Sequence, residues 1–362
     1  QRGREEVSLV GGGLPGDGGA GGAHSEKPPL QQPRGGEDER CPAPSGETGC
    51  SAGLRGKRAI AIYIAGLRER LLLTSMLKHL VQPLTRQGFA VHVYFSLTER
   101  NDTISYRNTR NSGSEDPSLK ALTGQALRAV LERRMREAGA CAMCVLVRST
   151  KEILPEIPRG PEFDNVMRQY PPWKSELGKN ILRLWQARES LWNASLQAER
   201  VLSEQYSLVL WTRPDQVWIS DVTSATSLLT QKNATKLVWS RKCLMWGGIN
   251  DKSVIMGRAA AEVMLTAYSR FLRLADTNWT TNPFPKTYNA EQFLKALAKK
   301  NEMKTKEVPW DKIPSADGMR IQDEVCVLKF YLCGKDAIAA AGNATYQNCE
   351  DVVKANKRKH KR

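Results

Sequence analysis

The sequence lacks the short motifs that identify several large classes of enzyme. It has no nucleophile elbow, no phosphate-cradling Gly-x-x-x-x-Gly-Lys loop and no dinucleotide-binding fingerprint. Histidine is scarce, with 4 in 362 residues, and His79 and His92 have no Ser, Cys or Asp partner at a recognisable spacing. These absences argue against a hydrolase, an ATPase and a dehydrogenase.

Long apolar runs are also missing. None approaches the ~18 residues that suggest a membrane-spanning helix, and the longest, residues 59–67, has the length of a strand. The chain does not begin with Met, so we expect a fragment or a processed chain. Any signal or membrane anchor would then lie upstream of this sequence.

The net charge of +16 calls for either a partner or a solvated basic segment. Part of it lies in the tail, residues 354–362, which could meet nucleic acid, acidic glycans or lipid headgroups, or could simply be a solvated tail. The remaining positive charge lies on predicted helices such as residues 127–136 and lacks the interleaved aromatic residues of an RNA-binding surface. We therefore expect no nucleic-acid partner.

Cysteines and glycosylation sequons bear on the compartment. The cysteines number eight, and only Cys141-Ala142-Met143-Cys144 has a metal-like interval. Because this pair leads into an apolar run, buried strand thiols are the first interpretation, disulfide partners the second, and metal or redox chemistry the third. Five Asn-x-Ser/Thr sequons favour a lumenal or extracellular location; they begin at Asn101, Asn193, Asn233, Asn278 and Asn343.

Composition divides the chain into three parts. Residues 1–56 lack periodicity and are rich in Gly, Pro and charge, which predicts a disordered stem or linker. Residues 57–335 carry strand and helix patterns and should form one domain. Residues 336–362 form a C-terminal extension that ends in the basic tail.

Within residues 57–335, strand and helix patterns alternate, which predicts an α/β domain with a mostly parallel sheet flanked by helices. The expected strands are residues 58–64, 89–95, 143–147, 206–212, 237–240 and 325–330. The expected helices are residues 72–84, 119–138, 179–205, 258–274 and 290–300. The longest of these helices has an apolar face that includes Val201, and its sequon residue Asn193 should point to solvent.

Ligands of open parallel sheets bind beyond the carboxyl ends of the strands, and two polar clusters fall there. In the first, Gly66 lets a ligand approach the backbone and Arg68 can meet a phosphate. In the second, Arg213 and Asp215 flank Pro214, which stops the strand. A guanidinium beside a carboxylate suits a diphosphate with a divalent cation. The alternative is that Arg213 and Asp215 merely pair with each other to finish a turn.

Other candidates are less specific. Asn250-Asp251 follows two glycines in a predicted loop and could supply a general base or position a hydroxyl, or could be an ordinary Asx turn. Glu262 and Tyr268 could face the site or the surface. Asp221 could be a second metal-side carboxylate or a helix cap, and Glu199 is most simply a solvated charge.

The order of several short motifs resembles a glycosyltransferase-like domain family, poorly characterised, of algae, plants and microbes, in which a strand ends in Arg-Pro-Asp. The resemblance covers roughly residues 57 to 330. The motifs are Ile64-Ala65-Gly66-Leu67-Arg68, residues 89–95, Leu208-Val209-Leu210-Trp211-Thr212-Arg213-Pro214-Asp215, Gly248-Ile249-Asn250-Asp251 with residues 252–257, Ala261-Glu262-Val263-Met264, and Ala290-Glu291-Gln292-Phe293-Leu294.

The resemblance implies a Rossmann-like fold of the GT-A type and roles for individual residues. Asp215 would hold a divalent metal (Mn²⁺ or Mg²⁺) and the donor diphosphate, with Gly66, Arg68 and Arg213 as further donor-binding residues. Asp251 would be catalytic, on the acceptor side. The usual Asp-x-Asp pair is absent, so basic side chains could neutralise the diphosphate in place of a metal.

The leading hypothesis is therefore an enzyme, a hexosyltransferase-like glycosyltransferase of the secretory pathway. It would use a nucleotide-sugar donor and a glycan or protein hydroxyl acceptor. It would work in the Golgi lumen on a membrane anchor that lies upstream of this chain, or as a secreted protein. The alternative is a non-catalytic secreted protein that binds acidic glycans through its basic surface.

Overall fold

The computed structural model describes residues 41, 58–99, 116–149, 155, 175–274, 287, 289–321, 324–327, 347–349 and 351. All of them belong to one compact unit, residues 39–362. The predicted stem lies outside the described residues except for Cys41, and so do the sequons at Asn101, Asn278 and Asn343. None of the described helices is both long enough and apolar enough to cross a membrane.

A seven-stranded sheet organises the domain, in the order β3-β2-β1-β4-β7-β6-β8. Its strands are β1 (Ala59–Leu67), β2 (Ala90–Glu99), β3 (Cys141–Ser149), β4 (Tyr206–Thr212), β6 (Leu237–Arg241), β7 (Ser253–Gly257) and β8 (Lys304–Val308). Strands β3, β2, β1 and β4 run parallel, whereas β7 is antiparallel to both of its neighbours. The predicted mostly parallel α/β fold is confirmed.

Both faces of the sheet are apolar because successive side chains of a strand point to opposite sides. In β1, Ile60, Ile62 and Ile64 belong to one core cluster. The alternate residues Ala61 and Tyr63 belong to the other. Small residues alternate with large ones, so the strand can be covered closely on both sides.

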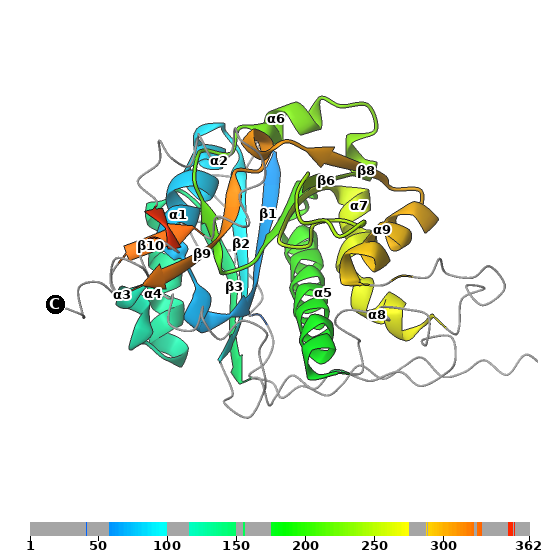
Figure 1. Ribbon diagram of the computed structural model, residues 1–362. Helices are drawn as coiled ribbons and strands as arrows, with labels where there is room; N and C mark the ends of the chain where they lie inside the picture. The colour runs from blue at the N-terminus through cyan, green and yellow to red at the C-terminus, as the bar shows by residue number, and fades with distance from the viewer. Residues whose placement is uncertain are drawn as a thin grey trace, which may run out of the picture. The chain divides into compact units, whose positions relative to one another are not determined.

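Helices cover the two faces in separate groups, which Figure 1 shows on either side of the strands. One face packs against α1 (Leu73–Met76), the π-helical segment η3 (Leu77–Val81), α2 (Gln82–Arg86), α4 (Gly124–Glu137) and α6 (Ser224–Leu229). The other packs against α5 (Glu176–Leu202), α7 (Arg258–Leu265), α8 (Ala267–Leu272) and α9 (Ala290–Lys300). The short helix α3 (Pro117–Lys120) precedes α4. The sheet is therefore the middle of three layers.

A second sheet of four strands lies beyond the end of β4. It has the order β11-β10-β9-β5 and contains β5 (Gln216–Trp218), β9 (Ser315–Ile321), β10 (Glu324–Val327) and β11 (Gln347–Asn348). Strand β5 begins one residue after Asp215 and pairs antiparallel with β9. The chain thus passes from the large sheet into the small one through the predicted ligand edge.

Several elements differ from the sequence prediction. The predicted helix 258–274 is two helices, α7 and α8, and the predicted helix 119–138 starts later, at Gly124. Val201, placed on the apolar face of α5, is 54% exposed. Glu199, interpreted as a solvated charge, is buried, because its carboxylate binds Arg258 and accepts a hydrogen bond from the Tyr206 amide. Asn193 is exposed, as predicted.

The cysteines correct a second prediction. Cys144 is disulfide-bonded to Cys41, with a Cα–Cα distance of 5.2 Å, so it is not a buried thiol. Cys326 is bonded to Cys349, and Cys141 and Cys243 are also disulfide-bonded. No described cysteine is free. The thiol and metal interpretations of the Cys141–Cys144 interval are therefore wrong, and the disulfide interpretation is confirmed.

A buried histidine makes stability depend on pH. The Nδ1 atom of His92 lies 2.7 Å from the Tyr206 hydroxyl, and its Nε2 atom is buried without a hydrogen-bond partner. Burial lowers the pKa of His92 to about 4, from an ordinary value near 6.5. Between these values the unfolded chain binds more protons than the folded one, so stability falls as the pH falls.

We therefore expect acidification from pH 6.5 to 4 to cost about 3 kcal/mol of unfolding free energy through His92 alone. Urea denaturation across this range measures it. The His92→Gln variant should start less stable at neutral pH but show a shallower decline. An equally steep decline in the variant would show that His92 is not the responsible group.

Candidate functional site

The sheet order reverses between β1 and β4. From β1 the chain proceeds through β2 and β3 to one edge, and β4 lies on the opposite side of β1. In open α/β sheets this switch point, at the carboxyl ends of the two strands, is where ligands bind. Ile64 is paired with Thr212 in the register, so Gly66-Leu67-Arg68 at the end of β1 lies next to Arg213-Pro214-Asp215 after β4. The two polar clusters predicted from the sequence are brought together.

Gly66 meets the chain itself at this edge. It has a φ of +147°, and a Cβ added to it would lie 2.8 Å from Pro214 Cδ. The proline ring therefore occupies the space that the sequence analysis assigned to an approaching ligand. The conformational freedom of Gly66 lets the two strand ends pack closely.

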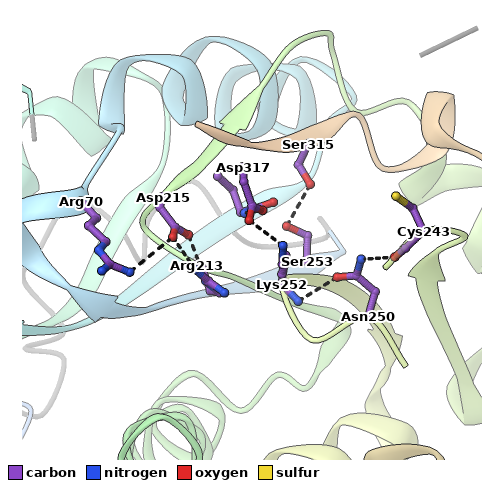
Figure 2. A network of polar contacts seen from close by, with 10 residues as sticks. Arg70, Arg213, Asp215, Cys243, Asn250, Lys252, Ser253, Ser315 and Asp317 are labelled. Atoms are coloured by element: carbon purple, nitrogen blue, oxygen red, sulfur yellow. Dashed lines mark hydrogen bonds and ion pairs between the residues drawn. The ribbon is translucent and has the colours of Figure 1, made fainter. Parts of the chain in front are cut away.

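Asp215 is buried, at 2% exposure, and its two carboxylate oxygens are engaged by Arg213. Arg213 Nε donates to Oδ1 at 3.0 Å and Nη2 donates to Oδ2, which is the bidentate geometry of an arginine–carboxylate pair. Arg70 Nη1 lies 3.9 Å from Oδ2 on the other side (Figure 2). The predicted alternative, in which Arg213 and Asp215 pair, is thus present in the structure.

Arg68 is buried and directed elsewhere. Its Nη1 atom donates to Glu99 at 2.9 Å and its Nη2 atom to the Leu119 carbonyl at 3.2 Å. The arginine of this segment that reaches the Asp215 carboxylate is instead Arg70. Arg68 therefore joins the end of β2 to helix α3, and its predicted role in donor binding stays a prediction.

The loop before β7 presents Asp251 to the site. Asn250 forms the Asx turn, because its Oδ1 accepts from the Lys252 amide at 3.0 Å, while its Nδ2 donates to the Cys243 carbonyl (Figure 2). The Asp251 side chain is half-buried, and no hydrogen bond or ion pair within the described residues uses its carboxylate. The carboxylate of Asp251 therefore takes no part in holding the loop.

Two side chains hold Asp251 in place through its backbone. Arg188 Nη2 donates to the Asp251 carbonyl at 2.7 Å, and Trp211 Nε1 donates to the same oxygen at 3.1 Å. The Arg188 guanidinium carbon lies 4.3 Å from the centroid of the Trp211 ring, a cation–π contact. Burial lowers the pKa of Arg188 to about 10, with Asp251 opposing and Arg213 assisting the shift, so the side chain is cationic at neutral pH.

A second buried carboxylate lies on β9. Asp317 accepts from Gln216 Nε2 at 2.6 Å and pairs with Lys252 Nζ at 2.5 Å (Figure 2). Burial alone raises the pKa of Asp317, but the charges of Lys252 and Arg213 and the two hydrogen bonds outweigh it and hold the pKa below its usual range. Asp317 is thus ionised at neutral pH, and the positive charges of Lys252 and Arg213 compensate its negative charge.

Arg241, at the end of β6, is the least compensated charge of the region. It is 2% exposed, and its Nε, Nη1 and Nη2 atoms are buried without a hydrogen-bond partner. Burial lowers its pKa, and the Asp317 carboxylate opposes that shift. Unsatisfied buried donors of this kind are uncommon in proteins and often mark a ligand, ion or water site.

We call eight of these residues the switch-point cluster: Arg70, Arg188, Arg213, Arg241, Lys252, Asp215, Asp251 and Asp317. Sequence reasoning identified Arg213, Asp215 and Asp251 among them. It missed Arg188 because it lies on an amphipathic helix with no local signal of its role. It missed Asp317 because β5 and β9 are paired across about a hundred residues of chain.

The remaining candidates lie apart from the cluster's contacts. Asp221 pairs with His79 Nδ1 and with Arg86 Nη2, both at 2.8 Å. The pairing gives His79 an acidic partner that spacing alone did not reveal. The Glu262 side chain is 63% exposed and lies 3.6 Å from Arg258 one turn earlier. Tyr268 packs against the core beneath α8.

The donor set at Asp215 does not suit a divalent cation. Metal sites of this type need several oxygen ligands, and the part of the chain that the structure describes has no group of three or more His, Cys, Asp or Glu side chains able to hold a metal. Both Asp215 oxygens already accept from Arg213. The predicted metal role of Asp215 therefore finds no supporting ligands among the described residues.

The fold and the edge define an α/β protein with a polar site at a topological switch point. No protein-family model matches the chain, and no curated protein matches it in sequence. Solved structures similar to it include three glycosyltransferases.

Mouse xyloside xylosyltransferase 1 is 9% identical, with a TM-score of 0.34, and the alignment covers 70% of this chain and 86% of that one. The glycosyltransferase GlyE of Streptococcus pneumoniae is 10% identical with a TM-score of 0.30, covering 70% of this chain and 46% of that one. The galactosyltransferase LgtC, with donor and acceptor sugar analogues, is 10% identical with a TM-score of 0.31, covering 66% and 70%.

Proposed function

We propose that this chain is a glycosyltransferase that moves a sugar from a nucleotide-sugar donor to a hydroxyl group of a glycan or protein. The observation that carries the proposal is the Asp251 carboxylate, half-buried and unengaged, beside buried arginines at the switch point of the sheet. This combination suits a reaction in which the carboxylate acts as a base and the arginines stabilise a diphosphate leaving group. The order of motifs from residue 57 to 330 supports the same class.

Asp251 and Arg213 have complementary roles in this proposal. The Asp251 carboxylate accepts the proton of the acceptor hydroxyl while that oxygen bonds to the anomeric carbon. The bond from that carbon to the diphosphate oxygen breaks, and the nucleoside diphosphate leaves with the electron pair. The Arg213 guanidinium belongs to the most exposed arginine side chain of the cluster, at 25%, and faces the growing negative charge.

We place the protein in the secretory pathway, in the Golgi lumen or outside the cell. Disulfides persist in oxidising compartments, and every described cysteine is disulfide-bonded. Two described sequon residues, Asn193 and Asn233, are exposed and accessible to a glycan. An anchor upstream of this chain would make it a type II membrane protein.

The test is a screen of nucleotide sugars for release of the nucleoside diphosphate, with and without Mn²⁺ and with mixed hydroxyl acceptors. We expect one donor to be turned over well above the rate without protein. No turnover of any donor, with the protein shown to be folded, would overturn the proposal. Salt-sensitive binding of acidic polysaccharides without turnover would favour the non-catalytic alternative.

A further inference from the structure

The switch-point cluster has a surplus of positive charge. Its five cationic side chains are opposed by three carboxylates, Asp215, Asp251 and Asp317, which leaves a net charge of two positive units. Arg188 and Arg241, the two most deeply buried cations, carry five unsatisfied donors: Nε and Nη1 of Arg188 and all three nitrogens of Arg241. Little water reaches them to screen their charge.

The charged side chains of the switch-point cluster interact electrostatically with one another across the site. Arg213 lies within electrostatic range of Asp215, Asp317 and Asp251, so it links the carboxylate between β4 and β5 and that on β9 to the carboxylate of the loop before β7. Asp251 acts on both Arg188 and Arg213. Charges in a low-dielectric wall act over longer distances than charges in water. A ligand beside Arg213 therefore experiences the buried arginines without touching them.

A divalent cation and a diphosphate would respond to this field in opposite ways. A cation would add two positive charges to a cluster that already has a surplus, and both oxygens of Asp215 already accept from Arg213. A diphosphate brings negative charge and several acceptor oxygens, which arginine binds well. We infer that the site binds the diphosphate of its ligand through the arginines of the switch-point cluster, without a divalent cation.

This inference rests on the proposed function only for the choice of a diphosphate, and it can be tested without turnover. The probe is inorganic pyrophosphate, titrated calorimetrically into the whole chain in buffer with EDTA. We expect binding in EDTA, weakened at least tenfold by Arg188→Gln. The matched control is Arg133→Gln on α4, which removes one charge from an exposed side chain on the opposite face of the sheet and should leave the affinity nearly unchanged.

A second variant protects the test if Arg188→Gln does not fold. Asp251→Asn removes a negative charge from the cluster and should tighten pyrophosphate binding, a sign that a purely structural role would not produce. Binding that requires Mn²⁺, or that responds equally to Arg188→Gln and Arg133→Gln, would overturn the inference. So would an unchanged or weaker affinity in Asp251→Asn.

The two proposals fail separately. Pyrophosphate binding in EDTA without turnover of any nucleotide sugar would leave the inference standing and remove the glycosyltransferase. Turnover that depends strictly on Mn²⁺ would leave the glycosyltransferase standing and remove the inference.

Discussion

Replacing Asp215 by alanine should lower the free energy of unfolding by about 3–5 kcal/mol, the usual cost of breaking a buried ion pair from one side. The carboxylate is 2% exposed and bonds Arg213 through both oxygens, with Arg70 on the other side. Its loss leaves two arginines close together without an anion between them. Urea denaturation at pH 7 measures the change.

Two comparisons make the Asp215 result specific. The double variant Asp215→Asn with Arg213→Gln removes both charges and should be more stable than Asp215→Ala alone, because the Arg213 charge is no longer left without the carboxylate that binds it. Asp311→Asn, which alters an exposed carboxylate, should change stability by no more than about 0.5 kcal/mol. If Asp215→Ala were as mild as Asp311→Asn, the pair would not be structural.

Asp251→Asn should lower activity and not stability, in contrast to Asp215→Ala. The rate of sugar transfer should fall by about 10²- to 10⁴-fold, the usual contribution of a general base. Stability should change little, because the contacts that hold residue 251 use its carbonyl, which asparagine retains. The initial rate of nucleoside diphosphate release from the donor identified in the screen measures the effect, with urea denaturation alongside.

Glu262→Gln is the matched control for Asp251→Asn, since it neutralises an exposed carboxylate on α7. It should leave both the rate and the stability close to those of the parent chain. A transfer rate in Asp251→Asn within a few-fold of that of Glu262→Gln would exclude Asp251 as the base. A stability loss comparable to that of Asp215→Ala would instead show that the carboxylate has a structural role.

The parts of the fold that could be predicted are those with a local signal. Strand β4 was predicted at its full length, because its apolar run ends at Arg213-Pro214, where proline stops the ladder. Helix α9 was predicted at its full length, and in the structure the Asn289 side chain caps its first turn by accepting from the Gln292 amide. Strand β8 was missed: four of its five residues are exposed, so it shows no apolar alternation.

The location of the candidate site could be predicted from the sequence, but the contacts among its side chains could not. Gly66 near the end of β1 and Arg-Pro-Asp after β4 mark the edge, and the strand order then brings them together. Whether Asp215 is free or paired depends on the rotamer of Arg213 and on Arg70, and no spacing rule specifies either. Arg188 and Arg241 join the switch-point cluster only through tertiary packing. The spacing of apolar residues in the sequence does not indicate that these two side chains are buried at the site.

The antiparallel pairing of β4 with β7 has a consequence for how the site could evolve. It sets Thr212 opposite Ser253, and the Arg213 amide donates to the Lys252 carbonyl at 3.0 Å. The two segments that carry Arg213 and Asp251 are thus joined by main-chain hydrogen bonds, which do not depend on the identity of the side chains. Substitutions of the side chains in these segments can therefore change the ligand preference, while the pairing of β4 with β7 keeps the distance between the segments constant.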